Sequence, residues 1–151
     1  MKVIYLLIIL FQNTNIFAKE IDDSYFYIDS DKLNITKIPL ASEFIGNAYA
    51  RNGENHFWGE RILIDYDNDK KIKLITIIEN VKIKRPDESI FGDKAIYELK
   101  LEKIKIIGNV SFTKDGNTVN GDELTVDLIN STSIIKGNKD NQVSIKVTKQ
   151  K

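Results

Sequence analysis

The sequence predicts an all-β fold built from repeated antiparallel strand pairs. Three observations support this fold class: apolar and polar residues alternate, turn-forming residues interrupt the alternating runs, and two short motifs recur along the chain. Only two of the 151 residues are proline. Because proline is confined to the ends, edges and bulges of strands, long strands can run uninterrupted here.

The alternation is clearest in three segments. Ile62, Ile64 and Tyr66 are separated by single residues, and the same spacing recurs within 124–128 and 143–147. A period of two places apolar side chains on one face of a strand. Many of these residues are β-branched, which suits a pleated and half-buried surface. We therefore expect strands that each bury one face.

Turn signals separate segments that are long enough for strands of about eight residues or more. Glycine, asparagine and aspartate tolerate the backbone of tight turns, and they cluster between the apolar runs. Long strands joined by short turns indicate hairpins and a largely antiparallel sheet. The signals lie at residues 52–55, 67–69, 85–87, 115–117, 130–132 and 139–141.

Two motifs occur three times with constant spacing. The first, Ile-x-Asn-(Ala/Val), lies at 45–48, 78–81 and 107–110, and the second ends in Gly-(Glu/Asp) at 59–60, 92–93 and 121–122. In every copy the asparagine precedes the glycine by 12 residues, and apolar residues follow the glycine at the third, fifth and seventh positions. Partial copies lie at 30–33 and 137–138. Such a repeat indicates a stacked array in which each unit covers its neighbour.

Each repeat is expected to form two strands, with the first motif inside one strand and the second strand beginning after the glycine. Glycine or asparagine within a strand favours a bulge or bend. The same bend in every unit would fold the sheet into two facing layers with an apolar interior. The acids Glu60, Asp93 and Asp122 suit turns at strand starts. A row of metal ligands is less well supported, because one acid per unit lacks the oxygen cage that calcium needs.

No catalytic, metal or cofactor site is predicted. His56 is the only histidine, and nothing near it marks a nucleophile or an orienting group, so we expect an exposed loop histidine. Phe57 and Trp58 are expected to pack in the core or at its rim. The chain has no cysteine, no phosphate-binding glycine loop and no nucleophile elbow.

Nucleic acid is not an expected partner. Lysine plus arginine equals aspartate plus glutamate, at 22 each, so no net field attracts a polyanion. Aromatic residues are also not interleaved with basic residues along the chain, as a stacking platform for bases requires.

The first 18 residues have the layout of a secretory signal peptide. Lys2 supplies a positive charge, residues 3–11 form an unbroken apolar run, and Ala18 ends the segment on a small residue. The run is short for a membrane-spanning helix, which needs about 20 apolar residues. We expect residues 1–18 to be removed and residues 19–151 to form one mature domain. An uncleaved anchor is the alternative.

The pattern Gly-Asn-Val-x-Phe at 108–112, followed by Gly-Asp-x-Leu-x-Val-Asp at 121–127, resembles the OstA-like family of lipopolysaccharide-transport proteins. The resemblance extends over residues 25–147. It implies a twisted, open β-jellyroll with an apolar groove, in a periplasmic protein without enzymatic activity or cofactor. Glu79 and Lys139 depart from the pattern, since they stand where the family has a glycine and an apolar residue. The second departure bears on the length of the last strands.

The resemblance also implies a function. Such a protein shields the acyl chains of lipopolysaccharide in its groove and bridges the inner and outer membranes during export. Its partners are lipopolysaccharide and other β-jellyroll proteins of the bridge, and it can associate head to tail with itself. On this interpretation the groove is lined by Ile62, Ile64, Val81, Ile83, Ala95, Leu99, Val110, Phe112, Leu124, Val126 and Leu128.

Partner contacts are expected at the two ends of the array, because edge strands carry unpaired backbone groups. The candidate residues are Tyr25, Phe26, Tyr27, Ile28, Val143, Ile145 and Val147. Two alternatives to the bridge function stay open. One is a membrane-anchored component of the same pathway, and the other is a structural β-scaffold whose apolar residues fill a closed core.

Overall fold

The computed structural model describes residues 25–148. Its ten strands form one antiparallel sheet in the order β1-β3-β4-β5-β6-β7-β8-β10, with β2 also paired to β3 and β9 also paired to β8. The predicted all-β, antiparallel fold is confirmed. The elements are β1 (Tyr27–Asp29), β2 (Lys32–Lys37), β3 (Leu40–Asn52), β4 (Asn55–Tyr66), β5 (Ile72–Lys84), β6 (Glu88–Glu98), the 3₁₀ turn η1 (Leu99–Leu101), β7 (Lys103–Lys114), β8 (Asn117–Asp127), β9 (Thr132–Lys136) and β10 (Ser144–Lys146).

The expected signal peptide, residues 1–18, lies outside the described residues. Within residues 25–148 the structure contains no helix with the length and hydrophobicity needed to span a membrane.

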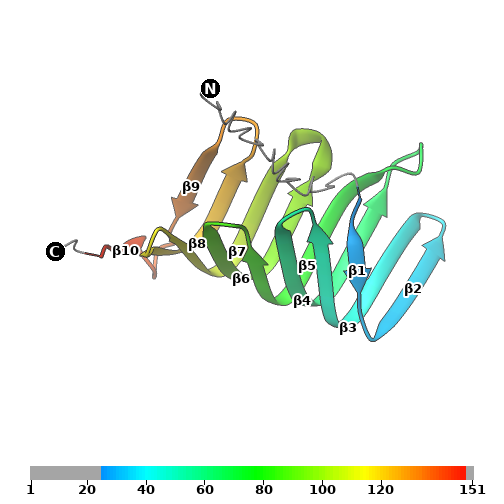
Figure 1. Ribbon diagram of the computed structural model, residues 1–151, viewed down its shortest axis with the longest axis horizontal. Helices are drawn as coiled ribbons and strands as arrows, with labels where there is room; N and C mark the ends of the chain where they lie inside the picture. The colour runs from blue at the N-terminus through cyan, green and yellow to red at the C-terminus, as the bar shows by residue number, and fades with distance from the viewer. Residues whose placement is uncertain (1–24, 149–151) are drawn as a thin grey trace, which may run out of the picture.

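Every long strand is bent at the same level, and the bends fold the sheet into two layers (Figure 1). Strand pairing is interrupted between Ile45 and Ala48 of β3, and at the equivalent points of β5 and β7. Layer A consists of 48–59, 81–92 and 110–121, with β1 and β10 at its ends. Layer B consists of 40–45, 61–66, 72–78, 94–98, 103–107 and 123–127, with β2 and β9 at its ends.

The first motif of the repeat produces these bends. Two consecutive residues of each copy have positive φ: Gly46 and Asn47 (82° and 46°), Glu79 and Asn80 (62° and 52°), and Gly108 and Asn109 (80° and 47°). Glycine adopts this left-handed region without steric cost, and asparagine tolerates it better than most residues do. The expectation that a repeated bend folds the sheet over along one line is confirmed.

The second motif lies inside a strand, so the expectation that a strand begins after each glycine was wrong. β4 runs through Gly59 and β6 runs through Gly92. A Cβ atom at Gly92 would overlap the Cγ2 atom of Ile106 on the neighbouring strand, and one at Gly59 would overlap Ile77 in the same way. Glycine is therefore needed where the backbone of one strand passes close under an isoleucine of the next.

The acids of the second motif are hydrogen-bond partners at the bends, rather than turn residues at strand starts. The Asn109 side-chain amide donates to Asp93 Oδ2 at 2.8 Å, and the Asn80 amide donates to Glu60 Oε1 at 3.1 Å. The partial copy at 30–33 does the same, since Asn47 donates to Asp31 at 2.8 Å. Asparagine and acid thus belong to successive strands, which explains why the two motifs recur together.

The last copy of this pair is incomplete. Asp122 is placed like Asp93, but its Oδ2 atom is buried without a hydrogen-bond partner. The side chain of Asn138 accepts the backbone N–H groups of Asp140 and Asn141 instead. The final strand is consequently broken into β9 and β10, at the position where Lys139 departs from the family pattern.

The six predicted turns all separate strands or strand halves, but the connections at 30–31, 38–39 and 99–102 were missed. Residues 99–102 join β6 to β7 through η1, and Glu102 closes the turn with a φ of 48° and a backbone N–H donated to Leu99 O. The segment Leu-Lys-Leu-Glu contains no glycine, proline, asparagine or aspartate. Composition therefore carried no signal for this turn.

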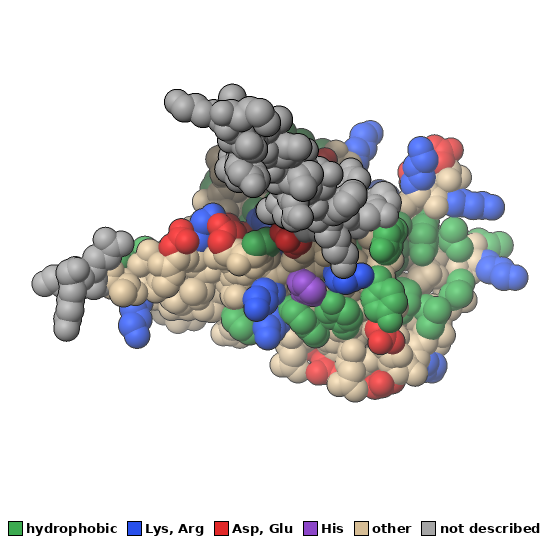
Figure 2. All heavy atoms as spheres, in the orientation of Figure 1, with side chains coloured by type: hydrophobic (Ala, Val, Ile, Leu, Met, Phe, Trp, Pro, Cys, Tyr) green, Lys and Arg blue, Asp and Glu red, His purple; other side chains and the backbone are tan. Residues whose placement is uncertain are grey.

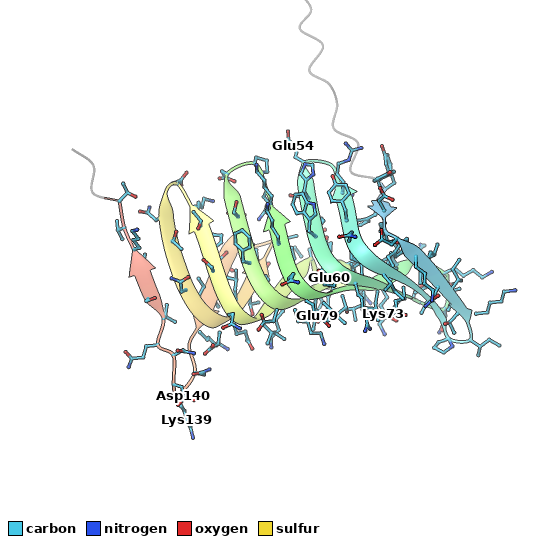
Figure 3. The ribbon with its side chains drawn as sticks, turned by 90° about the horizontal axis from the view of Figure 1, so that it is seen from below. Glu54, Glu60, Lys73, Glu79, Lys139 and Asp140 are labelled. Atoms are coloured by element: carbon cyan, nitrogen blue, oxygen red, sulfur yellow. The ribbon has the colours of Figure 1, made fainter. Side chains whose placement is uncertain are left out.

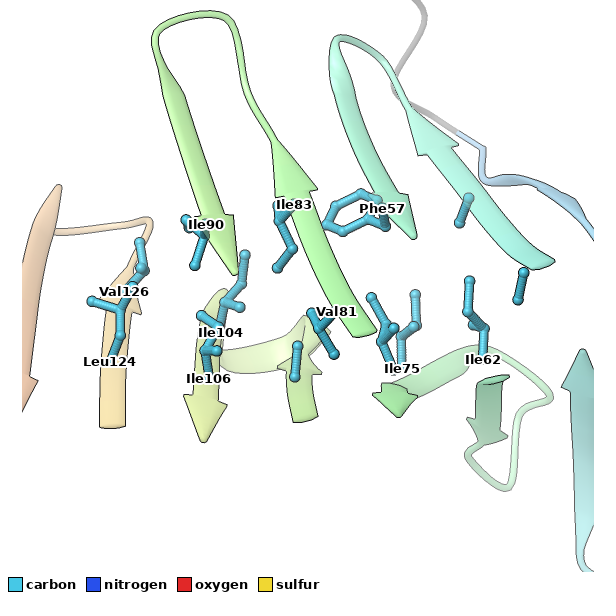
Figure 4. Close-up of a cluster of buried hydrophobic side chains, with 14 of the residues drawn as sticks. Phe57, Ile62, Ile75, Val81, Ile83, Ile90, Ile104, Ile106, Leu124 and Val126 are labelled. Atoms are coloured by element: carbon cyan, nitrogen blue, oxygen red, sulfur yellow. The ribbon is translucent and has the colours of Figure 1, made fainter. Parts of the chain in front are cut away.

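The space between the layers is filled by apolar side chains from both of them (Figure 4). In layer A, one row of cross-strand neighbours runs Ile28, Ala50, Phe57, Ile83, Ile90, Phe112, Val119 and Ile145. In layer B, the facing row runs Leu33, Phe44, Ile62, Ile77, Ala95, Ile106, Leu124 and Ile135. The middle of each row is buried, whereas Leu33 and Ile145 at the ends are 48% and 63% exposed.

Candidate functional site

The predicted lining residues all belong to the interior between the layers. Eight of them are buried in the hydrophobic core: Ile62, Ile64, Val81, Ile83, Ala95, Val110, Leu124 and Val126. The other three, Leu99, Phe112 and Leu128, are partly buried and pack against that core. The period-two reading therefore placed these side chains on the correct face. Whether they contact a lipid stays a prediction.

An apolar cavity opens between the layers. Its enclosed free volume is only about 10 Å³, about the room that one water molecule needs. Layer A and the segment before β1 contribute Phe26, Ala50, Phe57 and Ile83, and layer B contributes Ile75, Ile77, Ala95, Tyr97 and Ile104. Among these lining residues, Tyr97 alone has a polar side-chain atom. The lining is apolar, as in the concave sites that accept apolar ligands, but the free space in this conformation is too small for an acyl chain.

Sequence reasoning found only part of this cavity. Ile83 and Ala95 were predicted as lining, whereas Ile75, Ile77 and Ile104 were missed. These three lie on β5 and β7 just before the first motif, in segments that the repeat pattern did not include. The signal was nevertheless present, because Lys103 to Ile106 alternates basic and apolar residues with a period of two.

Tyr97 is the one titratable residue among those that line the cavity. Burial, and then the nearby carboxylate of Glu102, raises the pKa of the Tyr97 phenol above its ordinary value. The hydroxyl therefore stays protonated and uncharged at neutral pH, as an apolar site requires. The surface of the cavity is entirely apolar, so the Tyr97 ring lines it and the hydroxyl does not.

Phe57 and Trp58 lie on opposite sides of layer A. Phe57 is buried in the core, as expected, whereas Trp58 faces outward among polar residues. Tyr49 and His56 lie beside Trp58, with ring centroids 5.4 and 5.8 Å away, and the Lys82 ammonium lies 5.0 Å from the Trp58 ring centre. Aromatic and basic residues are thus interleaved across the sheet, although they are not interleaved along the chain.

The expectation of an exposed loop histidine was wrong. His56 is the second residue of β4, is only partly exposed, and shares a 2.8 Å hydrogen bond between its Nδ1 atom and the Tyr49 hydroxyl. The turn signal at 52–55 is real, but the strand begins directly at Asn55. Within residues 25–148, no three histidine, aspartate or glutamate side chains are grouped closely enough to hold a metal ion.

The predicted edge residues lie at or beside the two ends of the array. Tyr27 and Ile28 belong to β1, and Ile145 belongs to β10; the remaining candidates flank these strands. Sequence reasoning missed that layer B has its own edges, β2 and β9, which present Ile35 at 63% exposure and Ile134 at 57%. Each end of the array therefore carries two short strands with exposed apolar residues. Their contact with partners stays a prediction.

A family model described as LptA/(LptD N-terminal domain) LPS transport protein matches residues 27–132. This range contains β1 to β8 and all three complete copies of the repeat. The chain belongs to this family. It is consequently an LPS transport protein rather than an enzyme, and the predicted family is confirmed.

One solved structure shows the same fold. It is the crystal structure of LptH, the LptA-homologous periplasmic component of the lipopolysaccharide transport device of Pseudomonas aeruginosa. The two chains align with a TM-score of 0.75 over 85% of this chain and 99% of LptH, at 12% sequence identity. No curated protein sequence matches the chain.

Proposed function

We propose that the chain is a periplasmic lipopolysaccharide-binding protein that shields acyl chains between its two layers and bridges the inner and outer membranes during export. The observation that carries this proposal is the apolar cavity between layers A and B in a member of the LPS transport family. Each methylene group that moves from water into such a site contributes about 0.8 kcal/mol. An acyl chain is therefore a far better occupant than a polar solute.

Entry of a chain requires the layers to move apart. At the centre of the array their side chains touch, and Ile62 and Ile83 are almost fully buried. Strand pairing runs within each layer and not between the layers. The layers are thus held together by side-chain contacts and by the bends. An acyl chain between the layers can replace the side-chain contacts with equivalent apolar contacts.

A photo-crosslinking residue at position 97 tests lipid binding. Benzoylphenylalanine keeps the aromatic ring of tyrosine and extends it by a photoreactive benzoyl group, and the Tyr97 side chain lines the cavity. The matched control is position 96, because Ile96 points out of the opposite face of the same strand. We expect a lipopolysaccharide adduct at position 97 and none at position 96. Capture at neither position in a folded protein would favour the structural scaffold, and equal capture at both would indicate nonspecific association.

The bridging part of the proposal rests on the exposed end strands. Deleting residues 143–151 removes β10 and the apolar residues that flank it, whereas deleting residues 149–151 leaves β10 intact. We expect the longer deletion to weaken head-to-tail self-association, measured as the concentration dependence of mass in light scattering. Identical behaviour of the two deletions would argue against a role for this edge in assembly.

The same proposal includes removal of residues 1–18 during export. Mass spectrometry of the protein from the periplasmic fraction is expected to place the mature N-terminus at Lys19. Retention of residues 1–18 would instead favour a membrane-anchored component of the pathway.

A further inference from the structure

A row of basic side chains runs along the free rim of layer A. Arg51, His56 and Lys84 are directly opposite one another on β3, β4 and β5. Each lies next to a hairpin turn, at the end of the strand farthest from the bend. Neighbouring strands are about 4.8 Å apart, so the three groups lie within roughly 10 Å of one another. In Figure 2 the histidine, coloured purple, is flanked by blue basic side chains above a green apolar area.

Arg51 and Lys84 carry charges that no ion pair neutralises within residues 25–148. The ion pairs of the described chain engage Arg61, Arg85, Lys103, Lys105 and Lys114. None involves a residue of the rim row or the adjacent Lys82.

Arg51 faces Tyr27 and His56 across the neighbouring strands, and Lys84 faces His56 and Ser89, so neither cation has an acid directly opposite it. Asp87 and Glu88, in the hairpin after Lys84, pair with Arg85 and Lys114. Two further acids lie near the row: Glu54 in the β3–β4 turn (labelled in Figure 3) and Asp29, which is opposite Tyr49. Neither of them forms an ion pair with the row.

The rim row and the cavity wall belong to the same three strands. Ala50, Phe57 and Ile83 alternate with the basic residues along β3, β4 and β5, and their side chains line the cavity. At the rim, the basic row on the outward face and the cavity wall on the inward face are therefore separated only by the thickness of the sheet. An amphipathic molecule with an apolar chain in the cavity would have its polar end beside the basic row.

We propose that Arg51, His56 and Lys84 bind the phosphate groups on the sugar headgroup of a lipopolysaccharide whose acyl chain occupies the cavity. This inference rests on the proposed function. Arginine binds phosphate oxygens through two parallel N–H donors, and lysine adds a compact positive charge. His56 Nδ1 shares a hydrogen bond with the Tyr49 hydroxyl, which leaves Nε2 as the ring nitrogen that contacts a phosphate. The row thereby sets the position of the headgroup relative to the buried chain.

Trp58 provides the readout, because it is the only tryptophan of the chain and lies beside His56 and Lys82. Its fluorescence is titrated with purified phosphorylated lipid A, with the same lipid after dephosphorylation, and with inorganic phosphate alone. The test variant is Arg51→Gln/Lys84→Gln. The control variant is Lys73→Gln/Lys94→Gln, which removes two exposed and unpaired charges from layer B.

The test variant is expected to bind phosphorylated lipid A about tenfold more weakly or worse, because charge-assisted hydrogen bonds are lost. Its affinity for the dephosphorylated lipid should stay within about twofold, and the control variant should bind both lipids as the native chain does. An unchanged affinity of the test variant for phosphorylated lipid, or equal losses for both lipids, would overturn the inference. The inference would also be overturned if millimolar inorganic phosphate saturated the site with the same change in Trp58 fluorescence, because the site would then bind free phosphate.

The two proposals fail in different ways. If the native chain binds dephosphorylated lipid as tightly as phosphorylated lipid, the headgroup site is wrong and acyl shielding stands. If neither lipid binds, the proposed function itself is wrong.

Discussion

Replacing Glu79 by glycine is expected to stabilise the protein. Glu79 occupies the first position of the middle bend, where its φ is 62°. The equivalent residues of the other two bends are glycines, Gly46 and Gly108, with φ near 80°. The repeat thus places glutamate in a conformation for which glycine is the suitable residue.

The size of the gain follows from two opposing effects. A left-handed conformation costs a residue with a Cβ atom about 1–2 kcal/mol, and glycine removes this cost. Glycine also gives the unfolded chain more freedom, which costs about 0.4–1 kcal/mol. The exposed Glu79 side chain makes no hydrogen bond or ion pair with the described residues, so its removal adds no further loss. The net gain is about 0.5–1 kcal/mol.

Urea unfolding of the native chain, Glu79→Gly and Glu79→Ala measures this difference. Alanine removes the side chain but keeps the Cβ atom, so Glu79→Ala should change the free energy of unfolding very little. Equal m values in all three proteins are required before the midpoints are compared. No gain of Glu79→Gly over Glu79→Ala would refute the assignment of backbone strain to this position.

A substitution of the equivalent glycine in another bend provides a second check. Gly108→Ala introduces a Cβ atom at a φ of 80°, where it would overlap the carboxylate of Asp93. Its loss of stability should therefore exceed the gain from Glu79→Gly.

Two further predictions concern packing and pH. Gly92→Ala should destabilise the protein by about 1–3 kcal/mol, because its methyl group overlaps the buried Ile106 side chain; thermal unfolding measures the change, and a loss below about 0.5 kcal/mol would show that the strands separate easily. The pKa of Asp127 is lowered by the backbone N–H of Asn130, by the Asn130 side-chain amide, and to a smaller extent by Lys103. Its carboxylate therefore stabilises the fold at neutral pH, and this contribution is lost as the pH falls through the lowered pKa. Asp127→Asn should lose less stability than the native chain between neutral and acidic pH in urea unfolding, and an equal loss would contradict this role.

The amino-acid sequence by itself determined the strands, the repeat and the face that each strand buries. These features depend on local signals, because a period of two assigns faces and a constant spacing from Asn109 to Gly121 marks equivalent positions in each unit. The bend could be predicted for the same reason, since glycine and asparagine recur at one place in each strand. The family could be recognised because these local patterns are what its members share.

Only the tertiary structure decided which side chains of different strands meet. The pairing of Asn109 with Asp93, the missing partner of Asp122 and the grouping of Trp58 with Lys82 all depend on the register between strands. Each register is set by contacts between residues many positions apart, which no linear spacing specifies. The turn at 99–102 likewise forms because β6 and β7 pair on both sides of it, although its residues do not favour a turn.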